Sequence, residues 1–330
     1  MRFVHAFLLL ALGAATLAFA IHQQPKPEAP PAETGQPVFP GLAEKLPQAA
    51  RIEITGGGNT TTLLRLNNGD GPGWGVGERD SYPADPIRLR SLLAGLAELR
   101  LIEPRTANPE LFARLGLARP TTQGDSGTRL LVLAHNGAVL AEVILGHRSV
   151  RARPGMDDQI YLRRAGEERA WLAEGKLDAS ADPLTWLKRD LLDIKAERIA
   201  RIDISRDGAA LTLRRQGDLL ALDNPPPGKL DDVRPVEVAQ ALEDFSFVDV
   251  KSGDLPGTPA GSAQFTTTDG QRITVFLTQA GETVWARLAV SNADPRTALL
   301  FASHVYAMPA WRLDAIAPKA SDFIKQDATK

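Results

Sequence analysis

The sequence predicts an α+β protein in which one unit is used twice. The strand-like segment at residues 51–54 (RIEI) recurs at residues 201–204 (RIDI). After each copy come, in the same order, a polar turn, a second strand-like run, a helix with an acidic N-terminus and two further strand-like runs. A chain of 330 residues is long enough for two domains that each bury a core. We therefore expect two tandem antiparallel sheets, each with one or two helices packed on a face.

The segments of the chain follow a simple predicted order. Residues 1–22 are a signal peptide or membrane anchor, residues 23–42 a Pro-rich linker, residues 43–197 the first α+β repeat and residues 198–330 the second.

In the first repeat, local signals place a hairpin, a helix and a second hairpin. Alternation over residues 50–54 and the glycines at 56–58 predict a strand followed by a tight turn. Asp85 and Pro86 are a good helix start, and an apolar stripe follows them. Its members are Ile87, Leu89, Leu92, Leu93, Leu96 and Leu99. Asn136-Gly137 predicts the second hairpin, and residues 183–192 (PLTWLKRDLL) are expected to close the unit as a helix.

The second repeat carries matching signals. Asp207-Gly208 and Asp269-Gly270 predict its two hairpins. Asp231-Asp232 is interpreted as the cap of a helix. Four apolar residues of this helical segment are expected to face inwards: Val236, Val238, Leu242 and Phe245.

The N-terminal segment has the features of a targeting signal. Residues 3–21 are an apolar run that contains His5 and Thr16 but no Asp, Glu, Lys or Arg, close to the about 20 residues that span a bilayer. Ala18-Phe19-Ala20 is a small-x-small site that suits cleavage near Ala20. A cleaved signal and a retained anchor both stay open, and both deliver the body of the chain to a periplasmic or other extracytoplasmic place. Six prolines within residues 25–40 predict an extended tether, which favours the anchor.

Composition excludes several classes of function. The formal net charge of −2 gives no electrostatic case for nucleic acid. The absence of cysteine excludes disulfides, Cys-ligated zinc, iron–sulfur clusters and thiol nucleophiles. We predict no cofactor.

Several segments resemble a known family. They are Tyr82-Pro83-Ala84-Asp85, residues 115–120 (LGLARP), Leu145-Gly146, residues 160–162 (IYL) and residues 186–192 (WLKRDLL). With the N-terminal apolar segment, they resemble the bacterial membrane-anchored domain of unknown function 4340 family. Genes of that family often lie beside gliding-motility-type ABC transporter components, so the resemblance implies ABC transporter subunits as partners. It implies no catalytic residues.

The sequence contains no complete catalytic motif of the kinds considered. Gly124-Asp125-Ser126-Gly127 resembles a serine-protease nucleophile segment, but upstream histidines occur only at His5 and His22, in the export segment and its tether. The segment is better interpreted as a turn. His135 and His147 are expected at one end of a sheet, too few ligands for a metal.

The glycine-rich turn and the paired carboxylates do not match known phosphate-binding or calcium-binding sites. The glycines at 56–58 precede a strand, whereas a phosphate cradle needs a helix there. Asp157-Asp158 lacks the spacing of a calcium loop, and a carboxylate-based hydrolase stays open but unsupported.

Two clusters are candidate interaction surfaces. The first is a basic rim for an acidic partner or lipid headgroups, set against a plain solvated loop offset by Glu167 and Glu168. Its members are Arg148, Arg151, Arg153, Arg163 and Arg164. The second holds four tryptophans, three of them in strand or helix frames and expected in the core: Trp171, Trp186, Trp285 and Trp311.

The sequence therefore favours a non-enzymatic, membrane-tethered extracytoplasmic protein that assists a membrane complex. The alternative is a protein that binds a small ligand or glycan in a cleft between the two repeats, because pockets form at domain interfaces.

Overall fold

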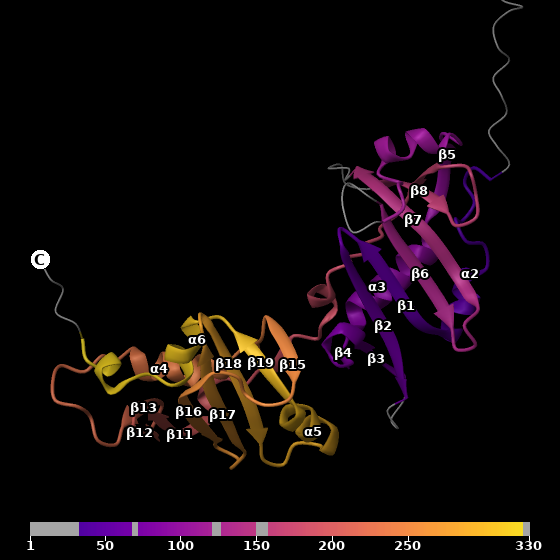
Figure 1. The fold of residues 1–330 in the computed structure, drawn as a ribbon. Coiled ribbons are helices and arrows are strands. Elements are labelled where there is room, and N and C mark those ends of the chain that lie inside the picture. Colours follow the sequence, from indigo (N-terminus) through magenta and orange to yellow (C-terminus); the bar gives the residue numbers. More distant parts are fainter. Residues whose placement is uncertain (1–32, 68–71, 121–126, 150–157, 326–330) are drawn as a thin grey trace, which may run out of the picture.

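Two large antiparallel sheets carry most of the protein (Figure 1). The structure is a computed structural model that describes residues 33–67, 72–120, 127–149 and 158–325. The predicted α+β fold is confirmed in this part of the chain. The predicted N-terminal helix lies outside the described residues, and within them no helix is long and apolar enough to cross a membrane.

The first sheet has nine strands in the order β4-β3-β2-β1-β6-β7-β8-β9-β5. The strands are β1 (Ala49–Gly56), β2 (Asn59–Asn67), β3 (Pro72–Val76), β4 (Tyr82–Pro83), β5 (Arg100–Pro104), β6 (Thr128–Ala134), β7 (Val139–Ser149), β8 (Gln159–Arg164) and β9 (Trp171–Glu174). The α-helices of this unit are α2 (Leu42–Lys45) and α3 (Pro86–Glu98). Short 3₁₀ helices span Leu46–Gln48, Gly77–Arg79, Pro109–Leu111, Ala113–Leu115 and Pro183–Trp186.

The second sheet has eight strands in the matching order β13-β12-β11-β16-β17-β18-β19-β15. The strands are β11 (Ile199–Arg206), β12 (Ala209–Gln216), β13 (Leu219–Leu222), β15 (Asp249–Ser252), β16 (Thr258–Thr267), β17 (Arg272–Ala280), β18 (Thr283–Val290) and β19 (His304–Met308). Its helices are α4 (Arg234–Ala239), α5 (Pro295–Ser303) and α6 (Trp311–Ile316), with 3₁₀ helices at Ala196–Arg198, Gln240–Leu242 and Ala320–Phe323. A two-stranded sheet pairs β10 (Asp190–Leu192) with β14 (Phe245–Ser246).

The duplication extends to the register of the strands. The β1–β6 ladder shifts between Ala49 and Arg51, and the β11–β16 ladder shifts between Ile199 and Arg201. An irregularity at the same place in both central ladders bends both sheets alike, because a bulge increases the local twist. The two units are therefore copies in geometry as well as in strand order.

Tight turns set that register. Gly57 and Gly58 have φ of 57° and 80°, and Asp207 and Gly208 have φ of 51° and 78°. Two positive φ values in a two-residue loop are the requirement of the type I′ hairpin, which matches the twist of the flanking strands. The glycine and aspartate turns predicted from the sequence are confirmed as hairpins.

Helix α3 forms where its start signal predicted. The side chain of Asp85 accepts hydrogen bonds from the backbone N–H groups of Ile87 and Arg88, at 2.8 and 3.2 Å. Gly95 is the point of closest approach, because a Cβ there would lie 2.1 Å from the carbonyl oxygen of Lys176. A Gly in a helix interior costs about 1 kcal/mol relative to Ala, and here it lets the helix pack against the chain after β9.

The closing segment at residues 183–192 is not the predicted helix. It forms one 3₁₀ turn that ends at Trp186 and then continues extended into β10. Backbone bonds explain the change: the N–H of Asp85 donates to the carbonyl of Trp186, and Leu192 pairs with Phe245. Long-range pairing here overrides a local helical pattern.

Two further helix predictions are corrected in detail. Asp231 caps no helix: it accepts from the N–H of Val233, one residue before α4 begins, as in an Asx-turn. Ile87 and Val236 are exposed rather than inward-facing, while Phe245 is buried but lies in β14. Ile87 lies two residues before the buried Leu89, and Val236 lies two residues before the buried Val238. Two residues correspond to about 200° around a helix, so both side chains lie away from these buried neighbours.

Candidate functional site: a groove between the two repeats

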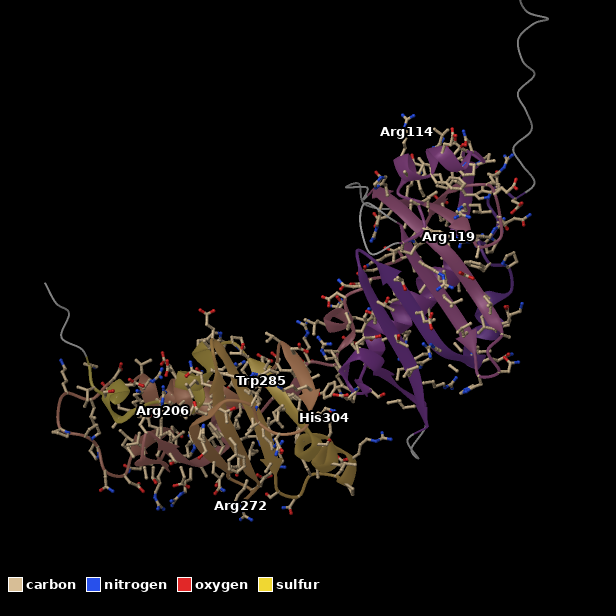
Figure 2. The ribbon with its side chains drawn as sticks, viewed as in Figure 1. Arg114, Arg119, Arg206, Arg272, Trp285 and His304 are labelled. Carbon is tan, nitrogen blue, oxygen red and sulfur yellow. The ribbon has the colours of Figure 1, made fainter. Side chains whose placement is uncertain are left out.

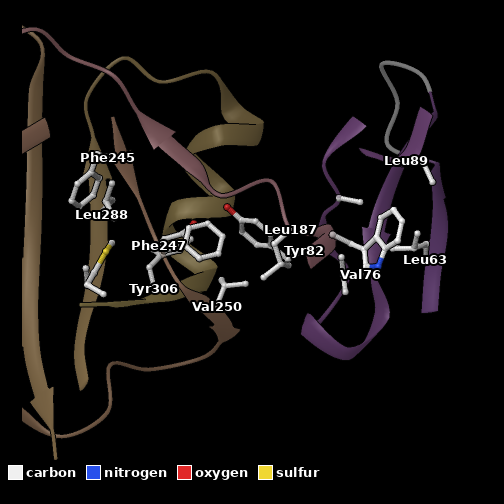
Figure 3. Packing of buried hydrophobic residues seen from close by; sticks show 14 of the residues in the cluster. Leu63, Val76, Tyr82, Leu89, Leu187, Phe245, Phe247, Val250, Leu288 and Tyr306 are labelled. Carbon is white, nitrogen blue, oxygen red and sulfur yellow. The ribbon is translucent and has the colours of Figure 1, made fainter. Parts of the chain in front are cut away.

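The two units meet through an aromatic cluster. Tyr82 of β4 lies with its ring centroid 5.3 Å from those of Phe247 and His304 and 6.1 Å from that of Tyr306. Figure 3 shows Tyr82 between Val76 of the first unit and the rings of Phe247 and Tyr306 of the second. Burial raises the pKa of both Tyr82 and Tyr306, so both stay neutral phenols. The cores of the two units are therefore one continuous apolar cluster.

Polar contacts flank the aromatic cluster. Arg79 forms a two-pronged ion pair with Asp249 of β15, with Nε–Oδ1 at 2.5 Å and Nη2–Oδ2 at 3.1 Å. Asp80 accepts hydrogen bonds from the backbone N–H and the hydroxyl of Ser252, at 3.1 and 2.8 Å. A bidentate arginine–carboxylate pair fixes orientation as well as distance. These contacts define how β15 sits against the turn before β4.

A groove of about 1340 Å³ opens beside this joint. Ligand pockets commonly hold about 300–1,000 Å³, so this groove is larger than a drug-sized molecule needs. It receives residues from both units and from the connection between them. Two smaller hollows, of about 430 and 230 Å³, lie elsewhere in the described part of the chain.

Helices α3 and α5 supply the two apolar walls. From α3 come Pro86, Leu89, Arg90, Leu93 and Ala94, and from α5 come Pro295, Arg296, Thr297, Leu299, Leu300, Phe301 and Ser303. Leu299 is 69% exposed, which leaves a large aliphatic side chain uncovered at the groove. Ala94 of α3 is exposed as well, whereas Leu89 is buried and Leu93 is partly buried and packs against the core.

The base of the groove is built from β3 and β4. Trp74 and Tyr82 line it together with Pro83 and Ala84. Ala84 also forms an antiparallel β-bridge with Leu187, which links this part of the groove to the connection between the units. His304, at the start of β19, also lines the groove. Figure 2 shows it at the edge of the second unit that faces the first unit.

The charges that line the groove are unbalanced. Arg90, Lys188 and Arg296 are cationic, and Asp190 is the one carboxylate among the described lining residues. All four side chains belong to exposed residues. Within the described residues, Arg90 and Lys188 make no ion pair. The groove is thus a positive site on a protein whose formal net charge is −2.

The predicted basic rim falls only partly within the described residues. Arg151 and Arg153 lie outside the described residues. Arg148 pairs with Asp158, and Arg164 pairs with Glu33 and with Glu167, the latter at 2.7 Å. Neutralised arginines attract an acidic partner weakly.

Arg163 differs from these neutralised arginines. Its guanidinium lies 4.8 Å from the ring centroid of Phe112. Burial, and then the neighbouring Arg119, lower the pKa of Arg163. The interaction surface proposed for these arginines stays a prediction.

The histidine pair does not form. His135 lies in the turn after β6, whereas His147 lies near the other end of β7 and packs on Gly116. The two strands are antiparallel, so residues next to the hairpin turn and residues near its open end are far apart. The described residues hold no group of three or more potential ligands that could bind a metal ion. Ser126 lies outside the described residues.

The tryptophans divide into two groups. Trp171 and Trp186 are buried core residues, as expected, and the indole of Trp186 donates to the carbonyl of Ser180. Trp285 is half-buried beneath Lys251, and Trp311 is 58% exposed and stacks on Arg312. The fifth tryptophan, Trp74, is the one that lines the groove.

Sequence reasoning missed helix α5. Its signal was present, because Asp294-Pro295 repeats the Asp-Pro start of α3, and Asp294 accepts from the N–H groups of Arg296 and Thr297. The cleft between the repeats was an alternative from the outset, but its walls depend on this helix.

Comparison with known families places the chain. The sequence model of a domain of unknown function, DUF4340, matches residues 74–264, which is more than half of the chain. The chain belongs to this family. The DUF4340 match runs from β3 into β16 and so includes α3, the connection between the units, and Tyr82 and Phe247 of the joint. Helix α5 and the joint residues His304 and Tyr306 lie beyond the match. No similar curated protein and no similar solved structure was found.

Proposed function

We propose that this DUF4340 protein is a non-enzymatic binding protein that takes an apolar ligand in the groove between its two repeats. The groove itself carries the proposal: it is large, mostly apolar and built by both units. Pockets at domain interfaces that combine apolar walls with few polar groups are typical ligand sites. One carboxylate in the described lining gives little support to a two-carboxylate hydrolase.

We also propose that residues 3–21 tether this binding body to a membrane and that it serves as an accessory of a membrane complex such as an ABC transport system. The apolar run and the six prolines that follow support the tether. Recovery of transporter subunits at near-stoichiometric yield with the tagged protein, from gently solubilised membranes, is the expected result. Recovery of the protein alone would count against a stable accessory role.

The groove is tested by photo-crosslinking of the full chain in neutral phosphatidylcholine nanodiscs. The probe is a long-chain alkane that carries a diazirine, and the readout is the set of labelled peptides. We expect labels on α3 and α5, because these helices line the groove. Labelling spread evenly over the surface, with no enrichment on these helices, would refute the binding site.

A matched pair of variants sharpens this test. Ala94→Trp fills the groove from an exposed position of α3, and we expect at least tenfold less label on α5. Ser91→Trp places the same side chain on the same helix outside the groove lining, at a residue that is also exposed, and should leave labelling unchanged. Equal losses from both variants would point to damage of α3 instead of occlusion.

A further inference from the structure

The charges at the groove indicate what kind of apolar ligand fits. Arg90 comes from α3, Lys188 from the connection and Arg296 from α5, so the three cations reach the groove from three separate elements. Asp190 offsets one of them. A negatively charged group at the groove would therefore meet a net positive lining, and exposed charges steer and select ligands by this complementarity.

Two of these cations, Arg90 and Lys188, differ from the paired arginines elsewhere in the protein. Arg79, Arg129 and Arg201 each hold a carboxylate within 2.7 Å. Within the described residues Arg90 and Lys188 have no such carboxylate. A cation without a partner keeps its full capacity for a charge-assisted hydrogen bond to an incoming anion.

The apolar part of the ligand must be long. The aliphatic walls include Leu93 on one side and Leu299 and Leu300 on the other, and the groove exceeds the volume of an ordinary small-molecule pocket. Burial of an alkyl chain contributes about 0.8 kcal/mol per CH₂ group. An extended chain therefore gains affinity along the whole groove, while a compact polar ligand such as a glycan does not.

We infer that the groove binds an anionic membrane lipid, with an acyl chain along the α3–α5 walls and its headgroup beside Arg90, Lys188 and Arg296. This inference rests on the proposed function and adds the ligand class to it. The lipid comes from the bilayer to which residues 3–21 are proposed to tether the protein. Apolar walls and cationic groups in one groove match the two parts of such a molecule.

The test uses two lipids that share one diazirine-bearing acyl chain and differ in the headgroup. Photoactivatable phosphatidylglycerol is anionic, and photoactivatable phosphatidylcholine has no net charge. With the full chain in mixed nanodiscs, we expect about tenfold more phosphatidylglycerol than phosphatidylcholine on α3 and α5 peptides. Tenfold corresponds to about 1.4 kcal/mol, which is within reach of one charge-assisted bond.

A charge-matched control separates the groove from general attraction to an anionic surface. Arg90→Glu with Lys188→Glu should abolish the preference for phosphatidylglycerol and leave phosphatidylcholine labelling unchanged. Arg114→Glu with Arg272→Glu makes the same change in net charge at exposed arginines outside the groove, at the sites shown in Figure 2. This control should keep the preference. Loss of the preference in both double variants would overturn the headgroup assignment.

The outcomes distinguish this inference from the proposed function. Equal labelling of α3 and α5 by both lipids would overturn the anionic headgroup and leave an apolar-ligand site. Labelling by the diazirine alkane without either lipid would overturn the lipid and keep the groove. A dimer or a partner peptide that protects α3 and α5 from all probes would overturn the lipid in favour of a protein occupant. No label on these helices from any probe would end both proposals.

Discussion

The two repeats have sheets of the same strand order but differ in what covers the outer face of each sheet. Leu130 pairs with Val143 in the first unit, and Ala263 pairs with Val275 in the second, so Ile144 and Phe276 occupy equivalent positions. Ile144 is 6% exposed and packs in a small second core, whereas Phe276 is 44% exposed.

The cause of this difference is the chain between the equivalent strands. Residues 105–120 return over the sheet in the first unit and bring Phe112 and Leu117 onto Ile144. In the second unit, residues 253–257 join β15 to β16 directly. The longer connection of the first unit therefore forms a second core on this face, and the described residues of the second unit show no matching cluster.

A second difference lies at the groove. Residues 165–170 join β8 to β9 in the first unit, while α5 occupies the same connection in the second. The helix that precedes the edge strand β5 in the first unit is long, since α3 runs from Pro86 to Glu98. The corresponding helix before β15 in the second unit is α4, which has six residues. Both walls of the groove are thus elements in which the copies differ. The shared sheets provide the scaffold, and the connections that diverged provide the site.

The largest expected effect comes from the joint between the copies. Tyr82→Ala removes a buried aromatic that contacts three rings of the second unit, and such truncations cost about 3–5 kcal/mol. Urea unfolding with far-UV circular dichroism gives the loss of stability. The control is Tyr161→Ala on the outer face of the first unit, where the ring is partly buried and the cost should be smaller. Equal costs would show that the aromatic joint is not a major source of stability.

The equivalent residues of the two outer faces should respond unequally. Ile144→Ala creates a cavity in a covered core and should cost about 2–4 kcal/mol. Phe276→Ala removes a larger side chain but leaves no cavity, so it should lower the free energy of unfolding by only about 0.5 kcal/mol. Chemical denaturation of both variants measures the pair. A large cost at Phe276 would mean that the second outer face is covered in solution.

The acidic residues before α3 and α4 provide a similar pair. Asp85→Ala removes two hydrogen bonds to the first turn of α3 and should cost about 1 kcal/mol. Asp231→Ala removes one turn bond ahead of α4 and should cost only a few tenths of that, about 0.3 kcal/mol. Thermal melts at one protein concentration rank the two variants. The opposite ranking would restore Asp231 as the helix cap predicted from its position.

The smallest effect is a pH dependence of the joint. Hydrogen bonds from the backbone and then the hydroxyl of Ser252 hold the pKa of Asp80 below its ordinary value of 3.8. A carboxyl whose pKa is lowered on folding stabilises the folded state above its ordinary pKa, and this contribution is lost as pH falls through the folded-state pKa. The free-energy difference between the wild type and Asp80→Asn should therefore be present at pH 6 and fade below about pH 4. A difference that stays the same from pH 6 down to about pH 2 would exclude this ion as the source.

Local signals in the sequence were sufficient for the sheets. Gly57-Gly58 and Asp207-Gly208 encode two-residue hairpins because few other residues adopt two successive positive φ values, and Gly137 supplies the one positive φ of the longer turn between β6 and β7. The Asp-Pro start of α3 likewise acts within four residues. Where a signal is local in this sense, as for the repeat and its turns, the sequence by itself determined the structure.

The groove was decided by the tertiary structure. Whether Leu299 is buried depends on which elements lie beside α5, and the sequence of that helix does not fix this. The end of the segment at 183–192 became a strand because β14, more than 50 residues away, offered backbone partners. Periodicity predicts which face of an element is apolar, but contacts across the joint decide which part of that face stays uncovered. That uncovered part, between α3 and α5, is the candidate site of this protein.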